Sequence, residues 1–231
     1  MGLIKEVNAL EIIQNVQSGD TIMVGGFGLI GSPLTLIDAL IKHDATDLTI
    51  ISNNVGEAGE GLGLLLRQGK IKKAIGSYFT SNREAVQYYN EGKLDIELIP
   101  QGTLSEAIRA GGAGIGGFYT KTAVGTELAK GKETKVIDGE TYLFEKALKA
   151  DVALIRAHKS DTKGNLIYYK TARNFNPIMA TAAKFVIAEV DEIVPDGELS
   201  PEEIITPHLY VDAIVKSELI LTKEGVVKRG S

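Results

Sequence analysis

Residues 21–43, "TIMVGGFGLIGSPLTLIDALIKH", constrain the fold most strongly. The apolar run "TIMV" predicts a strand buried on both faces, and it leads into a loop with four glycines in seven positions, 25–31. After the loop, Ser32 is expected to cap a helix and Pro33 suits its first turn. That helix has one apolar stripe, made by Leu36, Ile37, Leu40 and Ile41. A strand, a glycine loop and a helix in this order form one unit of a layered α/β fold.

The same unit recurs through the first half of the chain. Apolar runs predict further strands at 48–52, 71–78 and 96–100. Residues 63–69 belong to a helix, Ser81 with Glu84 forms a capping box for a helix that reaches about residue 90, and Thr103 with Glu106 caps another. An amphipathic helix is also expected at the N-terminus, through Leu10, Ile13 and Val16. Strands that alternate with helices favour a parallel sheet.

The second half adds shorter, antiparallel pieces. Asp138-Gly139 and Lys163-Gly164 are typical of hairpin turns, and 152–157 and 185–190 are apolar strands. Short helices are expected to begin at Asn176-Pro177 and at Ser200-Pro201. No linker or repeat divides the chain. We therefore predict a single domain over residues 1–231, with an open, mostly parallel sheet flanked by helices and some antiparallel strands.

Composition excludes several classes of function. The net charge is −5 and no basic run could follow a phosphate backbone, so nucleic acid is not an expected partner. The chain has no cysteine, which excludes disulfides and thiol catalysis, and its three histidines are scattered, so no metal site is expected. The first residues do not resemble a signal peptide and no apolar run is long enough to span a membrane. We expect a cytoplasmic protein without membrane attachment.

The glycine loop contains G-x-G-x-x-G at Gly26, Gly28 and Gly31, which is the fingerprint of a dinucleotide-binding domain. A Rossmann-like domain also needs an acidic residue about 20 positions further on, at the end of the second strand, to bind the ribose. Here that strand ends in "SNN", residues 52–54. Dinucleotide binding through the three glycines remains an alternative at this point.

Three further polar residues are candidates for chemistry. Glu57 and Glu60 lie in a glycine-rich loop, where a carboxylate could act as a covalent nucleophile, although solvated loop charges are the favoured interpretation. Gln101 directly follows an apolar strand, so its side-chain amide is expected at the carboxyl edge of the sheet. An amide in that place can donate a hydrogen bond to a developing oxyanion.

Several blocks together resemble the family I CoA-transferases, specifically the A (alpha) subunit of the 3-oxoacid or acetate type. The first block is "GDTIMVGGFGLIGSP", whose matching positions are Asp20, Gly25, Gly26, Phe27, Gly31 and Pro33. Others are "SNNVGEAGEGLGLLL", "LIPQGTLSEAIRAGGAGIGGFYT", "TARNFNPIMATAAKFVIAEVDEIV" and "PHLYVD", in family order over nearly the whole chain. The resemblance implies the fold of CoA-transferases and NagB-like proteins.

The resemblance also implies a shared active site. In this family the acyl group passes from CoA to a glutamate in a Glu-Asn-Gly motif of the B half, and this chain contains no Glu-Asn pair. It is therefore expected to need a separate B (beta) subunit, in a hetero-oligomer such as A2B2. The implied reaction moves CoA between a short-chain acyl-CoA and a 3-oxo or simple carboxylic acid, of the acetoacetate, succinate, acetate or butyrate class. The CoA thioester is a substrate, and no tightly bound cofactor is expected.

Site residues follow from the matching motifs. Gln101 would support the oxyanion, and residues 110–118, "AGGAGIGGF", would border the acyl pocket. The residues expected to bind CoA and the acyl group are Gly25, Gly26, Phe27, Gly28, Leu29, Ile30, Gly31, Asn53 and Asn54. A third hypothesis, a purely structural or regulatory subunit, is left open because the chain has no nucleophile of its own in this motif.

Overall fold

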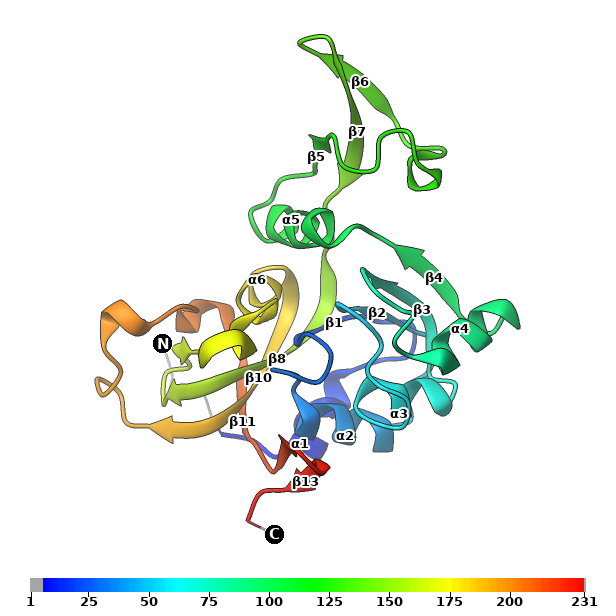
Figure 1. The fold of residues 1–231 in the computed structure, drawn as a ribbon. Helices are drawn as coiled ribbons and strands as arrows, with labels where there is room; N and C mark the ends of the chain where they lie inside the picture. Colours follow the sequence, from blue (N-terminus) through cyan, green and yellow to red (C-terminus); the bar gives the residue numbers. More distant parts are fainter. Residues whose placement is uncertain (1–5, 231) are drawn as a thin grey trace.

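A computed structural model describes residues 6–230 of the chain. Its main sheet contains parallel strands in the order β11-β10-β8-β1-β2-β3-β4, and β9 (Leu166–Ile167) pairs antiparallel with β8 (Figure 1). The parallel strands are β1 (Thr21–Val24), β2 (Leu48–Ile51), β3 (Ile71–Gly76), β4 (Asp95–Leu98), β8 (Ala150–Asp161), β10 (Ala183–Val194) and β11 (Ala213–Lys216). The open, mostly parallel sheet predicted from the sequence is confirmed.

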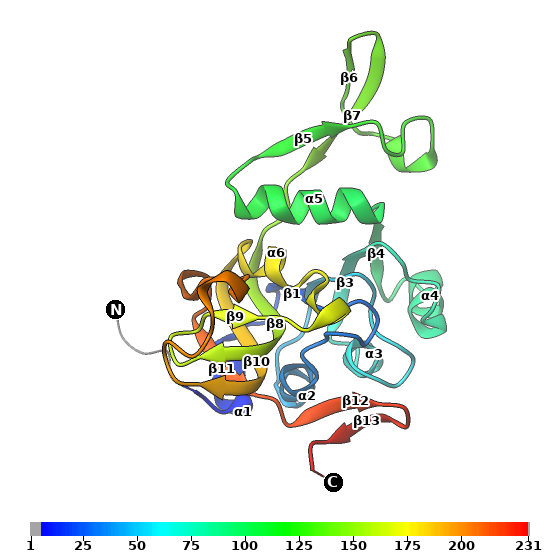
Figure 2. The same ribbon diagram turned by 60° about the vertical axis from the view of Figure 1, so that its left-hand side comes forward.

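Helices cover both faces of this sheet (Figure 2). One face packs against α1 (Ala9–Ile12), α2 (Leu34–Lys42), α3 (Leu62–Arg67) and α4 (Arg83–Asn90), and the other against α5 (Gln101–Gly112) and α6 (Asn176–Ala180). Short 3-10 helices lie at η1 (Ile13–Asn15), η2 (Glu127–Ala129), η3 (Lys170–Arg173), η4 (Pro201–Glu203) and η5 (His208–Tyr210). Strand β1 alternates between the two cores, with Ile22 and Val24 on one side and Met23 on the other.

Two predicted helix caps are wrong because other groups take their place. Ser32 does not cap α2, since its hydroxyl donates to the carbonyl of Gly28 at 2.9 Å instead. The cap of α4 is Asn82, one residue after Ser81, and its side chain accepts from the backbone N–H of Glu84 at 3.1 Å. The helices themselves lie where the apolar pattern places them.

Helix α5 begins at Gln101, earlier than predicted. Thr103 therefore lies inside the helix, where it is buried, and caps nothing. The short helix predicted to begin at Ser200-Pro201 is present as the 3-10 helix η4, although Ser200 makes no capping bond to it. The earlier start of α5 matters because it places Gln101 on the first turn of a rigid helix.

Apart from β9, the antiparallel strands lie outside the main sheet. The predicted turn at Asp138 and Gly139 is confirmed, with φ of 51° and 80°, and joins β6 (Thr134–Ile137) to β7 (Glu140–Lys146). With β5 (Gly117–Thr120) they form a sheet that projects beyond α5 (Figure 2). Lys163-Gly164 turns between β8 and β9 as predicted, and β12 (Leu219–Thr222) pairs with β13 (Gly225–Lys228) near the C-terminus. Among residues 6–230, no helix has the length and apolar character needed to cross a membrane.

Helix α5 is held against the connection to β8 by a close approach at Gly111. A Cβ atom at this glycine would lie 1.9 Å from the carbonyl oxygen of Leu148, whereas a Cβ at Gly102 of the same helix would meet nothing within 4 Å. We therefore expect Gly111→Ala to lower the free energy of unfolding by about 1–3 kcal/mol, as overpacked sites do. Gly102→Ala is the matched control and should be neutral or stabilising by up to about 1 kcal/mol. Urea unfolding of both variants makes the comparison, and equal effects would contradict the close packing.

Candidate functional site

The glycine loop, residues 25–31, lies at the carboxyl edge of the main sheet. Val24 at the end of β1 pairs with Leu154, so the remainder of β8 runs past the loop, as does the adjacent part of β10. Gly26, Gly28 and Gly31 have φ of 119°, 58° and 72°, which side-chain-bearing residues rarely adopt. The loop therefore depends on its glycines for its shape, and it separates two hollows of the surface.

The first hollow, which we call the Gln101 groove, has a volume of about 430 Å³. Phe27, at the tip of the glycine loop, is 48% exposed in it. Gln101 lies on the first turn of α5 and lines the groove. Its side chain forms no hydrogen bond with any other residue among residues 6–230. The lining residues include Phe27, Gln101, Ser105, Asn174, Phe175 and Ile178. A free amide thus faces an open groove with apolar walls, as an oxyanion donor would.

Asn53 and Asn54 lie behind the loop and are both buried. The Asn53 side chain accepts from Gly28 N–H at 3.4 Å and donates to the Ser77 hydroxyl at 3.0 Å. Asn54 accepts from Gly56 N–H at 3.0 Å. Neither lines the Gln101 groove, so in this structure they support the loops next to it, and their predicted contact with CoA or acyl group stays a prediction.

Glu57 and Glu60 are partners in a tight turn of the loop after Asn54, where the backbone N–H of Glu60 donates to the carbonyl of Glu57 at 3.1 Å. Their side chains are not among the residues that line the Gln101 groove. The structure therefore does not bring either carboxylate together with Gln101.

A buried carboxylate accepts hydrogen bonds from the first backbone N–H groups of helix α2. Glu189, fully buried on β10, accepts from the backbone N–H groups of Thr35 and Leu36 at 2.9 and 3.3 Å. The hydroxyls of Thr35 and Ser217 donate to its other oxygen at 3.1 and 2.7 Å. These are the donors that the N-terminus of a helix leaves free for an anion. Glu189 occupies the position that a bound phosphate would take.

Arg156 balances this carboxylate. Its guanidinium donates to Glu189 at 2.9 Å and to Asp191 at 2.6 Å. Burial raises the pKa of the Glu189 carboxyl, and the charge of Arg156 together with the hydroxyl and backbone donors limits that rise. Backbone N–H and guanidinium groups can only donate, so the arrangement suits the ionised carboxylate.

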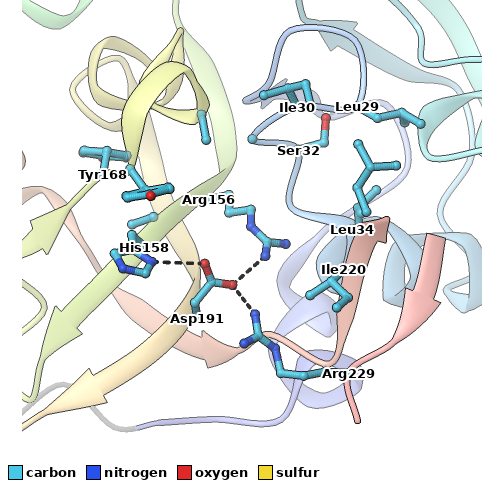
Figure 3. A pocket seen from close by; sticks show the side chains of 15 residues that line it. Leu29, Ile30, Ser32, Leu34, Arg156, His158, Tyr168, Asp191, Ile220 and Arg229 are labelled. Carbon is cyan, nitrogen blue, oxygen red and sulfur yellow. Dashed lines mark hydrogen bonds and ion pairs between the residues drawn. The ribbon is translucent and has the colours of Figure 1, made fainter. Parts of the chain in front are cut away.

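Arg156 also reaches the second hollow, which we call the arginine pocket, on the other side of the glycine loop (Figure 3). Its volume is about 280 Å³, and Leu29 and Ile30 of the loop form part of its wall. Figure 3 shows Asp191 receiving bonds from Arg156, Arg229 and, at 3.4 Å, His158. The loop residues expected to bind ligand are thus divided, with Phe27 in one hollow and Leu29 and Ile30 in the other.

Two of the three histidines, His43 and His208, make hydrogen bonds to nearby residues outside the two hollows. The Nδ1 atom of His43 accepts from Ala45 N–H at 3.2 Å, and His208 contacts Asn165 at 3.2 Å. No group of three or more potential metal ligands is found in the part of the chain that is described, residues 6–230.

The residues around the site that the sequence did not single out are Arg156, Asn174, Asn176 and Glu189, which hold the glycine loop or the start of α2. The sequence did contain one indication of the role of Glu189. It lies inside the apolar run "FVIAEV", where an acidic residue must be buried and paired. The two asparagines lie in the family-like block 171–194, but local spacing does not indicate their partners in the glycine loop, which are more than a hundred residues away.

The dinucleotide interpretation fails on the geometry of α2. A pyrophosphate would need the free N–H groups at this helix terminus, and Glu189 already accepts from those of Thr35 and Leu36. The second strand offers Ser52 and Asn53 in place of the ribose-binding acid, and both side chains are buried in hydrogen bonds to neighbouring loops and strands. The sequence comparisons point the same way.

Residues 7–217 match the family model described as coenzyme A transferase. The chain is 52% identical over 205 residues to the A (alpha) component of the probable succinyl-CoA:3-ketoacid coenzyme A transferase of Bacillus subtilis (strain 168), covering 89% of this chain and 86% of that protein. It is 48% identical over 202 residues to the alpha component of the acetate CoA-transferase of Escherichia coli (strain K12), covering 87% and 92%.

Solved structures share the fold. The acyl-CoA transferase YdiF from Escherichia coli O157:H7 superposes with a TM-score of 0.81 at 23% identity, over 93% of this chain. This chain spans 47% of that longer chain. Glutaconate coenzyme A-transferase from Acidaminococcus fermentans gives a TM-score of 0.78 at 24% identity, over 92% of this chain and 75% of the other.

Glu189→Gln should destabilise the protein strongly. An amide cannot neutralise Arg156, and its NH₂ group would face donors, so the free energy of unfolding should fall by about 3–5 kcal/mol, as when one partner of a buried ion pair is removed. Asp38→Asn is the control on α2, because Asp38 forms an exposed pair with Lys42 at 2.6 Å. Such a pair contributes about 0.5 kcal/mol or less. Urea unfolding at neutral pH measures both, and a loss at Glu189 as small as the control would show that the carboxylate does not anchor α2.

Proposed function

Because the chain belongs to the coenzyme A transferase family, we propose that it is the alpha subunit of a heteromeric CoA-transferase. It would move CoA between a short-chain acyl-CoA and a 3-oxo or simple carboxylic acid, of the acetoacetate, succinate, acetate or butyrate class. The observation that supports this is the Gln101 groove, which is open and largely apolar, has a free amide, and is lined by no carboxylate among residues 6–230. The missing nucleophile would come from a separate beta subunit.

The proposed reaction divides between the two subunits. The partner's glutamate attacks the thioester carbonyl, the CoA thiolate leaves, and an acyl-glutamyl anhydride forms. The thiolate then attacks the glutamyl carbonyl and releases the donor acid, which leaves a glutamyl-CoA thioester. The acceptor carboxylate reverses these two steps. Gln101 would donate through its Nε2 atom to the oxyanion of each tetrahedral intermediate, where such a donor acts on the transition state.

Assembly and location are part of the same proposal. We expect a hetero-oligomer such as A2B2, acting in the cytoplasm in ketone-body or short-chain fatty-acid metabolism, with the CoA thioester as substrate and no resident cofactor. The relatives carry names that denote one component of a larger enzyme, which supports the need for a partner. We also treat residues 1–231 as one domain, since the apolar clusters on both faces share the main sheet.

The chain should transfer no CoA alone and should do so when mixed with its partner. The assay mixes the two purified proteins with acetoacetate, acetate, butyrate or succinate as acceptor and a short acyl-CoA as donor, and follows new acyl-CoA by chromatography. Transfer by the isolated chain would contradict the shared site, and no transfer by the mixture with any of these acids would contradict the proposed function.

Gln101→Ala in the reconstituted complex should lower kcat by about 10²–10³-fold, the usual cost of removing one oxyanion donor. Gln87→Ala is a matched control, because Gln87 is exposed on α4 and bonds only Glu91 among the described residues. It should leave kcat unchanged. An unchanged kcat for Gln101→Ala would favour the hypothesis of a purely structural or regulatory subunit.

A further inference from the structure

Asn174 holds both ends of the turn that carries Phe27. Its Oδ1 atom accepts from Gly26 N–H at 3.1 Å, and its Nδ2 atom donates to the carbonyl of Ile30 at 3.0 Å. Within this turn, Phe27 and Ile30 bond each other through both backbone groups, at 2.9 and 3.2 Å. One side chain therefore fixes where the tip of the loop stands relative to the sheet.

Asn176 supports the same loop from beneath. It is fully buried, donates to the carbonyl of Gly31 at 3.0 Å and accepts from Arg156 N–H at 2.8 Å. A Cβ atom at Gly25 would lie 1.8 Å from its Oδ1 atom, and one at Gly31 would lie 2.4 Å from the carbonyl oxygen of Ala172 and 2.7 Å from Nδ2 of Asn174. The Asn176 side chain thus leaves no room for a side chain at Gly25, and the Ala172 backbone together with the Asn174 side chain leaves none at Gly31.

The amide of Asn174 has no capacity left for a ligand. Besides Gly26, its oxygen accepts from Phe175 N–H at 2.7 Å and from Asn176 at 3.2 Å. Its nitrogen donates to Thr171 in addition to Ile30. An amide has two N–H donors and an oxygen with two lone pairs, and all of them are engaged here. Asn174 lines the Gln101 groove, yet its polar atoms face the protein.

The backbone of Asn174 is strained. Its φ is 22° and its ψ is −122°, outside the common regions for a residue with a side chain. Such conformations cost free energy and persist where the surroundings enforce them, often beside functional sites. Here the strained backbone is what lets the side chain reach both Gly26 and Ile30.

We propose that Asn174 is a positioning residue, which acts on the transfer reaction by fixing Phe27 and its turn opposite Gln101. The proposal rests on the proposed function for its effect on turnover, and on the loop geometry alone for its effect on structure. Asn174 contributes no bond to the reacting atoms.

Two substitutions test the effect on turnover in the reconstituted complex. Asn174→Asp keeps the shape but turns an oxygen toward the carbonyls of Ile30 and Thr171, and Asn174→Ala removes the bonds without adding charge. We expect kcat/KM for acyl-CoA to fall by about 10–100-fold, because the displaced turn carries residues that are expected to contact the acyl-CoA.

The matched control is Asn165→Ala. Asn165 also bonds through both side-chain atoms, to Asp161 at 2.7 Å and to His208 N–H at 2.9 Å, but at the turn between β8 and β9. It should lower thermal stability to a similar degree and leave kcat/KM of the folded complex unchanged. Equal effects of Asn174→Ala and Asn165→Ala on kcat/KM would overturn the positioning role.

Amide hydrogen exchange on the isolated chain gives a readout that needs no activity. Peptides that cover residues 24–34 should exchange about tenfold faster or more in Asn174→Ala, because local bonds to Gly26 and Ile30 are lost, and should not change in Asn165→Ala. Unchanged exchange in Asn174→Ala would show that this side chain does not hold the loop. If the wild-type complex transfers no CoA, the proposed function fails, while hydrogen exchange still decides whether Asn174 positions the turn.

Discussion

The buried carboxylate of Glu189 is the interaction on which the carboxyl edge of this sheet depends. It joins the start of α2, through Thr35 and Leu36, to Arg156 on β8 and to Ser217 after β11. The hydroxyl of Thr35 in turn accepts from the backbone N–H groups that open β12, at 3.0 and 3.1 Å. The free N–H groups at the start of a helix and the charge of a buried arginine both favour a nearby anion. The carboxylate of Glu189 accepts hydrogen bonds from both groups, so no bound ligand is required.

This anchor decides what the glycine loop can do. In dinucleotide-binding folds the loop brings a phosphate to the end of the helix, but here a protein carboxylate already occupies that place. The loop is left to present its own apolar side chains, with Phe27 in the Gln101 groove and Leu29 and Ile30 in the arginine pocket. A surface of this kind suits an acyl or pantetheine chain better than a pyrophosphate, which agrees with membership of the coenzyme A transferase family.

The sequence predicted the layers of the fold well because they depend on local patterns. Runs such as "TIMV" and the apolar stripe of α2 need only their own spacing to be recognised, and the turn at Asp138-Gly139 needs only residues that tolerate positive φ. Helix caps were predicted less well. Ser32, for example, does not cap α2, because its hydroxyl donates to the carbonyl of Gly28. Gln101 was predicted at the sheet edge, and the structure places it there.

The supports of the site could not be predicted in the same way. Glu189 lies 154 residues from Thr35, and Asn174 lies 148 residues from Gly26, so neither pairing leaves a trace in local spacing. Asn53 and Asn54 are buried behind the loop, where their side chains accept from backbone N–H groups, and their expected contact with CoA or the acyl group stays a prediction. Long-range hydrogen bonds, which only the folded chain assembles, determine the shape of the groove.

We propose that this chain holds half of a transferase site and that the nucleophile lies on the partner subunit. The most direct measurement is mass spectrometry of the reconstituted complex after incubation with acyl-CoA and proteolysis, which locates the covalent CoA adduct. We expect the adduct on a glutamate of the partner subunit, with none on this chain. An adduct on Glu57 or Glu60 would contradict it, because the nucleophile would then lie in this chain itself.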